Sequence, residues 1–159
     1  NKVNSNVANP QYSFFGCKNT TMSSSIEREQ AFDYLNGGKK YLINVNKKNW
    51  QKEIILSLET IQNKGCHGII SANGYFALEI KKQILEKFPA LINTKIVTVD
   101  NEEPFFMDAQ NIDRIAQPYF EFGQKSFELV KRQNDLGPLW KADKYLLKGK
   151  LIYALAQRH

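Results

Sequence analysis

Residues 68–88 read GIISANGYFALEIKKQILEKF, and this stretch decides the fold class. Its opening run, Gly68–Ala72, is short and apolar, as is typical of a strand buried on both faces. From Tyr75 to Phe88 the apolar residues recur at helical spacing, and Pro89 closes the predicted helix because proline cannot continue it. A buried strand followed at once by an amphipathic helix is the repeating unit of an α/β protein.

The same alternation continues on both sides of this stretch. Further strands are predicted at residues 11–17, 40–46 and 95–100, and further helices at residues 24–35 and 50–63. The first of these helices has a capping box formed by Ser24 and Glu27. Apolar strands separated by helices predict a parallel sheet with helices on both faces, a doubly wound α/β layer structure.

The last third of the chain departs from this rhythm. We expect a loop at residues 102–111 and a short strand at 112–117, after which Pro118 opens a helix that runs to about Arg132. Short strands are predicted at residues 145–147 and 151–153.

The composition is that of a soluble globular protein. The 159 residues are 42% hydrophobic and 24% charged, and no apolar run is long enough to span a bilayer. Cys17 and Cys66 are too few for a disulfide framework, and we expect both to be reduced core thiols in a cytoplasmic protein. The start, Asn1–Asn4, resembles neither a signal peptide nor a natural initiation, so we expect the chain to be trimmed from a longer one.

The net charge of +6 raises the question of a nucleic-acid partner. The lysines occur as scattered pairs such as Lys39-Lys40 and Lys81-Lys82, without base-stacking aromatics between them. Since no nucleic-acid-binding motif is present, we interpret them as a solvated surface.

Enzyme motifs are absent from the sequence. There is no Gly-x-Gly-x-x-Gly loop, no Walker loop and no Gly-x-Ser-x-Gly nucleophile elbow. His67 lies in the turn before a predicted strand, at the sheet edge opposite the expected ligand site. No Cys/His cluster has metal-ligand spacing. We therefore predict no catalytic residue, no metal and no cofactor.

The expected ligand site lies beyond the carboxyl ends of the parallel strands, where open α/β sheets bind ligands. Four side chains collect there: Arg28, Trp50, Asn73 and Asp100. Arginine offers a planar fork of donors, aspartate and asparagine pair with vicinal hydroxyls, and an indole stacks on a sugar ring. This set favours a sugar or a similar polar ring.

Each of these residues also has a structural interpretation. Asn73 could cap the helix that follows it, and Asp100 could cap a turn or helix. Arg28 could pair with Glu29 or Asp33, and Trp50 could pack on the core. Their common location is what favours a binding role.

Several segments, in order, carry a resemblance to the LacI/GalR (lactose-repressor-like) family of transcriptional regulators. Residues 112–130, IDRIAQPYFEFGQKSFELV, resemble the family's T-T-I-x-Q-P-x-x-x-x-G-x-x-A-x-x-L segment, with Gln117-Pro118, Glu121 and Gly123 in register. The other similar segments are SIEREQAF at 25–32, GIISANGYFALE at 68–79, IVTVDN at 96–101 and YLLKGKLIY at 145–153. The sequence departs from the family where Ala31 replaces a glycine, Gly74 an aspartate, and Thr98-Val99 a Gly-Phe pair.

The resemblance implies a type I periplasmic-binding-protein-like fold and a role for each candidate. The positions of Arg28, Asn73 and Asp100 contact the effector in this family, and that of Trp50 often stacks on the sugar. Gln117 falls at a crossover between lobes and marks the hinge.

The resemblance also implies a domain organisation. Residues 1–159 are expected to be the C-terminal part of the effector-binding domain, with a main lobe at 10–112 and 145–155 and a crossover segment at 113–144. The N-terminal lobe and the helix-turn-helix DNA-binding domain are expected to be absent. Family members pack the helix at 118–132 on that lobe, so its apolar face needs another cover here.

The expected function is that of a sensor in a transcriptional repressor. A sugar or similar polar metabolite would modulate operator binding by a cytoplasmic homodimer, which would contact DNA only through the absent domain, with no membrane association. One alternative is a periplasmic sugar-binding protein of a transporter, and another is an enzyme on a flavodoxin-like fold.

Overall fold

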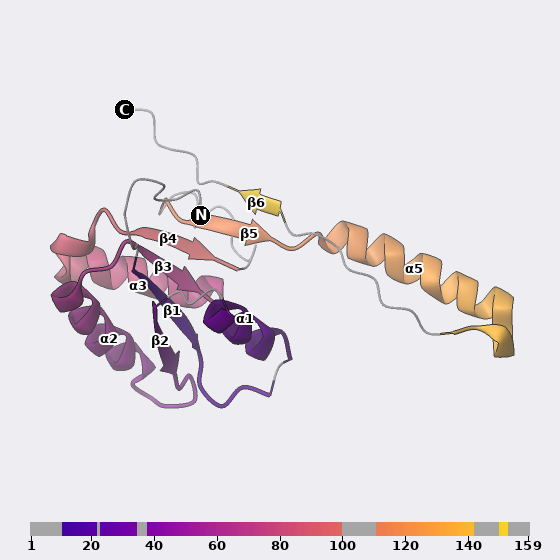
Figure 1. Cartoon of the computed structure of the whole chain (residues 1–159), viewed down its shortest axis with the longest axis horizontal. Helices are drawn as coiled ribbons and strands as arrows, with labels where there is room; N and C mark the ends of the chain where they lie inside the picture. The colour runs from indigo at the N-terminus through magenta and orange to yellow at the C-terminus, as the bar shows by residue number, and fades with distance from the viewer. Residues whose placement is uncertain (1–10, 22, 35–37, 100–110, 142–149, 153–159) are drawn as a thin grey trace.

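The computed structural model describes residues 11–21, 23–34, 38–99, 111–141 and 150–152. Its centre is one sheet with helices on both faces, and a long helix extends away from it (Figure 1). The predicted fold class, a parallel α/β sheet covered on both faces, is confirmed.

The sheet has six strands in the order β2-β1-β3-β4-β5-β6. Strands β1 to β5 are parallel to their neighbours, and β6 runs antiparallel to β5. Their bounds are β1 Tyr12–Cys17, β2 Gly38–Ile43, β3 Gly68–Ser71, β4 Lys95–Thr98, β5 Asp113–Ala116 and β6 Lys150–Ile152.

The helices divide between the two faces of the sheet. They are α1 Ser23–Tyr34, α2 Trp50–Lys64, α3 Gly74–Lys87 and α5 Tyr119–Leu136, with 3₁₀ turns η1 Pro89–Leu91 and η2 Gly137–Leu139. Helices α2 and α3 share one core cluster with one face of the sheet, whereas α1 packs on the other face. Figure 1 shows α1 on the side of the sheet away from α2 and α3.

Strand β1 separates the two cores. Because side chains alternate along a strand, Phe15 enters the α2/α3 core while Phe14 stacks on Phe32 of α1, with ring centroids 5.3 Å apart. Both phenylalanines of β1 are buried. Burying a side chain of this size contributes about 1.5–3 kcal/mol, so the strand ties both faces to one sheet.

The strand order reverses between β1 and β3. The connection from β1 through α1 leads outward to β2, and the connection from β2 through α2 returns past β1 to β3. Since crossovers are right-handed, this reversal sends α1 and α3 to opposite faces. Their preceding loops diverge at the carboxyl ends of β1 and β3, the position where ligands bind in such sheets.

Several predicted boundaries are corrected by the structure. Helix α1 begins at Ser23, so Ser24 lies inside it and is not the N-cap. Strand β2 occupies Gly38–Ile43 instead of 40–46, because the chain turns at Asn44, whose backbone N–H donates to Glu53. Helix α5 continues to Leu136, four residues beyond the predicted end. The predicted loop at 102–110 and strand at 145–147 lie outside the described residues.

Ile80 of α3 tests the core on the α2/α3 face because its side chain is fully buried in that core. We expect Ile80→Ala to lower the free energy of unfolding by about 2–5 kcal/mol, from lost burial and the cavity left behind. Leu56→Ala on α2, where the side chain is 62% exposed, should change it by no more than about 0.5 kcal/mol. Denaturant unfolding followed by circular dichroism measures both, and equal costs would contradict this core.

Candidate ligand-binding site

Arg28 and Asn73, two of the predicted site residues, both reach the point where β1 and β3 diverge. The Arg28 guanidinium donates through Nη1 to the carbonyl oxygen of Ala72 over 2.7 Å. The next residue, Asn73, lies with its Nδ2 3.9 Å from the Sγ of Cys17 at the end of β1. A side chain from α1 thus reaches around the sheet edge to the start of α3.

The structural interpretation of Asn73 is confirmed. Its extended backbone makes it the N-cap of α3, and its Oδ1 accepts a 2.9 Å hydrogen bond from the backbone N–H of Phe76. The amide still turns its Nδ2 toward Cys17. Capping and site formation are therefore compatible uses of this one side chain.

The structural interpretation of Arg28 is wrong. Glu29 and Asp33, its two suggested partners, both pair with Lys40 of β2 at 2.8 Å. Because Lys40 neutralises these carboxylates, Arg28 is left to bind the backbone at the sheet edge. The guanidinium is half-buried, and no carboxylate of the described residues pairs with it.

Cys17 belongs to this cluster, although the sequence indicated only a core thiol. It is half-buried, and burial raises the pKa of its thiol while the positive charge of Arg28 acts to lower it. The thiol therefore stays neutral at neutral pH. Its place as the last residue of β1 is the signal that could have identified it as part of the edge.

Trp50 reaches the same region from α2. It is the first residue of that helix, and its indole lies 5.7 Å from the ring of Phe76, measured between centroids, at an interplanar angle of 40°. The indole is half-buried against the core, so the packing interpretation is confirmed. The backbone N–H of Phe76 donates to Asn73. Phe76 therefore links Trp50 to the cluster of Arg28, Cys17 and Asn73.

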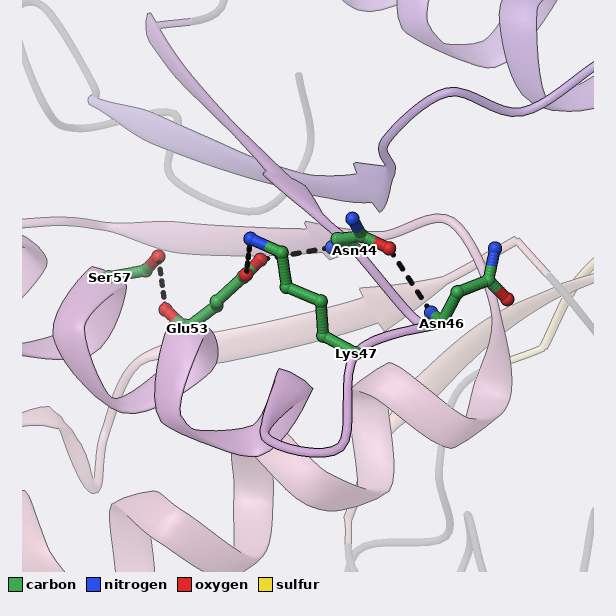
Figure 2. A network of polar contacts seen from close by, with 5 residues as sticks. All are labelled: Asn44, Asn46, Lys47, Glu53 and Ser57. Atoms are coloured by element: carbon green, nitrogen blue, oxygen red, sulfur yellow. Dashed lines mark hydrogen bonds and ion pairs between the residues drawn. The ribbon is translucent and has the colours of Figure 1, made fainter.

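A polar network holds the loop before Trp50 (Figure 2). Glu53 of α2 accepts from the backbone N–H of Asn44 at 3.0 Å and pairs with Lys47 at 3.3 Å. Asn44 in turn accepts from the backbone N–H of Asn46 at 3.2 Å. The bond from Asn44 lowers the pKa of the Glu53 carboxyl, with Lys47 adding to the effect. This loop was not singled out in the sequence, and it fixes where α2 begins.

A row of buried polar side chains, which sequence reasoning missed, crosses the sheet just inside this edge. The strand registers pair Ser71 with Thr98 and Thr98 with Arg114, so all three lie on the α2/α3 face. Ser71 donates its hydroxyl to the carbonyl of Asn73 at 2.7 Å. Thr98 is fully buried, and within the described part of the chain its Oγ1 has no hydrogen-bond partner. Both residues end their strands.

Two further residues were predicted for the site, Asp100 and Gln117. Asp100 lies outside the described residues. Gln117 follows β5 directly, at the junction where the chain leaves the sheet for α5 (Figure 1). Its role as a hinge stays a prediction.

Other chemistry is distant from this edge or not found in the described part of the chain. His67 lies at the opposite edge, as predicted, where its Nδ1 accepts from the backbone N–H of Gln11 at 3.0 Å. Within the described ranges no group of three or more histidine, cysteine, aspartate or glutamate side chains could hold a metal ion. None of the described helices is long and apolar enough to cross a membrane.

The Glu53 network gives a pH-dependent prediction. Because the pKa of Glu53 is lowered on folding from its ordinary value of 4.5, the carboxylate stabilises the native state above that pH. This stabilisation is lost as the pH falls through the folded-state pKa. We expect Glu53→Gln to be less stable than the wild type at pH 7 and to approach it under acid, by urea unfolding across pH 3–7. Glu59→Gln, on an exposed side chain of α2, should follow the wild type. A Glu53→Gln deficit that is constant with pH would rule out this role.

Comparison with known proteins identifies the fold. No protein-family model matches the chain, and no curated protein matches it. A LacI-family transcriptional regulator from Bifidobacterium animalis subsp. lactis is 14% identical with a TM-score of 0.68, over 92% of this chain and 55% of that one. A putative LacI-family repressor from Corynebacterium glutamicum is 13% identical with a TM-score of 0.63, over 91% and 56%.

This chain thus spans about half the length of each similar structure. Both similar structures are LacI-family proteins of transcription regulation. The resemblance noted in the sequence is therefore confirmed at the level of fold: the chain has the α/β fold of part of a LacI-family transcriptional regulator.

Proposed function

We propose that this chain is the effector-binding part of a LacI-type transcriptional regulator and that it binds a small polar molecule at the carboxyl edge between β1 and β3. The observation that carries this proposal is the meeting of Arg28, Cys17 and Asn73 at the point where the strand order reverses. Ligands bind at this point in open α/β sheets. The shared fold with two transcription regulators supports the regulatory context.

The side chains at this edge suit a sugar-like ligand. Arg28 uses one of its five N–H donors on Ala72, which leaves others to bind hydroxyl oxygens. The half-buried indole of Trp50 packs on the ring of Phe76 and presents an apolar surface for a ring of the ligand. Asp100, two residues after the end of β4, is proposed to accept hydrogen bonds from the ligand's hydroxyls.

We further propose that α5 belongs to a second lobe, which would form the other wall of the site. None of its residues is buried, and Phe120 and Phe127 are 74% and 73% exposed. At 3.6 residues per turn the charged residues of α5 share about a third of its circumference. They are Glu121, Lys125, Glu128, Lys131, Arg132 and Asp135. Most of the remaining surface is apolar and needs a cover.

The size of the similar structures supports this second lobe. Close to half of each of those chains has no counterpart in these 159 residues. The sequence predicts a main lobe and a crossover segment that starts at residue 113. Because β5, residues 113–116, pairs with β4 and β6 in the sheet, we propose that the crossover segment begins at Gln117 instead.

Regulation would follow from closure of the two lobes on the ligand, with Gln117 as the hinge. A ligand that binds the closed form more tightly shifts the equilibrium toward that form. In a homodimer that carries separate DNA-binding domains, such a shift would alter affinity for operator DNA. We propose this mechanism for the full-length cytoplasmic protein.

Ligand binding is tested by a thermal-shift screen of sugars, sugar phosphates and nucleobases on this chain and on the longer protein. At a hundredfold excess over its Kd a ligand should stabilise the protein by about 2.7 kcal/mol. Arg28→Ala and Asp100→Ala should each abolish the shift, whereas Lys64→Ala, at the far end of α2, should retain it. Absence of any ligand for the longer protein would refute the sensor, and turnover of a ligand would favour an enzyme.

The second lobe is tested by amide hydrogen exchange. In this chain alone α5 should exchange much faster than α3, because α5 has no buried residue whereas Phe76, Ile80 and Ile84 of α3 are buried. In the longer protein α5 should become protected. Protection of α5 equal to that of α3 in the isolated chain, or no added protection in the longer protein, would argue against this lobe.

A further inference from the structure

We propose that the ligand carries an anionic group, a carboxylate or a phosphate, which binds between Arg28 and the first turn of α3. This inference rests on the proposed function and specifies the chemical class of its ligand. It arises from the charge balance at the edge between β1 and β3, from the N-terminus of α3, and from one buried hydroxyl.

The first observation is a half-buried cation without a counter-ion. Within the described ranges, the only hydrogen bond of the Arg28 guanidinium is its contact with the carbonyl of Ala72. Cys17 cannot supply a negative charge, because burial raises the pKa of its thiol. The neighbouring amide of Asn73 is neutral. A partly desolvated guanidinium gains most from a carboxylate or phosphate, to which it can make two parallel hydrogen bonds.

The second observation is the orientation of α3 toward the same point. Helix α3 has 14 residues and begins at Gly74, two residues after the carbonyl that Arg28 binds. In its first turn the N–H groups of Phe76 and Ala77 bond to Asn73. The N–H groups of Gly74 and Tyr75 remain at the positively polarised end of the helix, which favours an anion.

The third observation is the hydroxyl of Thr98. This side chain is fully buried, and its Oγ1 has no hydrogen-bond partner among the described residues, which is costly for a buried polar group. It neighbours Ser71 in the cross-strand row, and Ser71 donates to the carbonyl of the α3 N-cap residue, Asn73. Thr98 is therefore the cross-strand neighbour of the residue that bonds to the N-cap of α3. An anion oxygen seated there would supply the acceptor that this hydroxyl lacks.

These features are better matched to an anion than to a neutral ring alone. A neutral hydroxyl could accept from Arg28, but an anionic oxygen would also compensate the guanidinium charge, which no carboxylate of the described residues does. The N–H groups of α3, the Thr98 hydroxyl and Arg28 are all donors, and carboxylate and phosphate oxygens only accept. A ligand with a polar ring near Trp50 and an anionic group near Arg28 would use both parts of the edge.

The test is a titration of this chain with inorganic phosphate and, separately, with acetate, at constant ionic strength set by sodium chloride. Binding is followed by the amide NMR signals of Gly74 and Tyr75. We expect at least one of the two anions to shift these signals in a saturable manner that chloride does not reproduce. Which anion binds distinguishes a phosphate-bearing from a carboxylate-bearing ligand. Failure of both to shift the signals overturns the proposal.

Two matched pairs of variants locate the site. Arg28→Met should raise the Kd of the anion roughly tenfold or more, whereas Lys81→Met, which removes the same charge from the middle of α3, should leave it unchanged. Thr98→Val should also weaken binding, whereas Thr60→Val on α2 should not. Equal effects of Arg28→Met and Lys81→Met would overturn the proposal as a nonspecific charge effect. If Arg28→Met does not fold, an unchanged Kd in Thr98→Val overturns it.

A comparison of glucose, gluconate and glucose 6-phosphate separates this inference from the proposed function. Tighter, Arg28-dependent binding of an anionic member of the set supports the inference. Tighter binding of glucose, lost in Arg28→Met, would overturn the anionic group and leave the proposed sensor intact. Absence of any ligand from the wider screen would instead remove the proposed function.

Discussion

The parallel pairing of β1 with β3 is the constraint on which the rest of this molecule depends. Residues 12–15 of β1 pair with residues 68–71 of β3, although the two strands are separated by α1, β2 and α2 in the sequence. This pairing brings the ends of both strands together while their helices leave on opposite faces. Arg28 of α1 and Asn73, the N-cap of α3, reach the same edge because of this divergence.

The edge where they meet combines structural and binding roles in the same side chains. Asn73 caps α3, Trp50 packs on Phe76, and Arg28 joins α1 to the end of β3. Each contact limits the motion of a side chain that the proposed ligand would use. Side chains already held in position lose less conformational entropy on binding, which favours affinity. The Glu53 network has the same effect on the loop that leads to Trp50.

The sheet with its three helices is packed into hydrophobic cores, whereas α5 is not packed against any core of the described residues. The sheet with α1, α2 and α3 contains both hydrophobic clusters, whereas α5 has no buried residue. A helix of 18 residues with an apolar surface this large is stabilised mostly by tertiary packing. The proposed second lobe would supply that packing and place an opposite wall over Arg28, Trp50 and Asn73.

The layer structure could be predicted from the sequence, since strand and helix periodicity depend on local spacing. Gly68–Ala72 and Tyr75–Phe88 were predicted within one or two residues of β3 and α3. The sequence also placed Arg28, Trp50 and Asn73 at one edge, because parallel strands share their carboxyl ends. Only the tertiary structure decided the partners. Lys40 takes the carboxylates next to Arg28, Cys17 joins the edge, and Thr98 is buried beside Ser71. These contacts join residues from different strands and helices, and strand order and register, which local periodicity does not specify, set which of them meet.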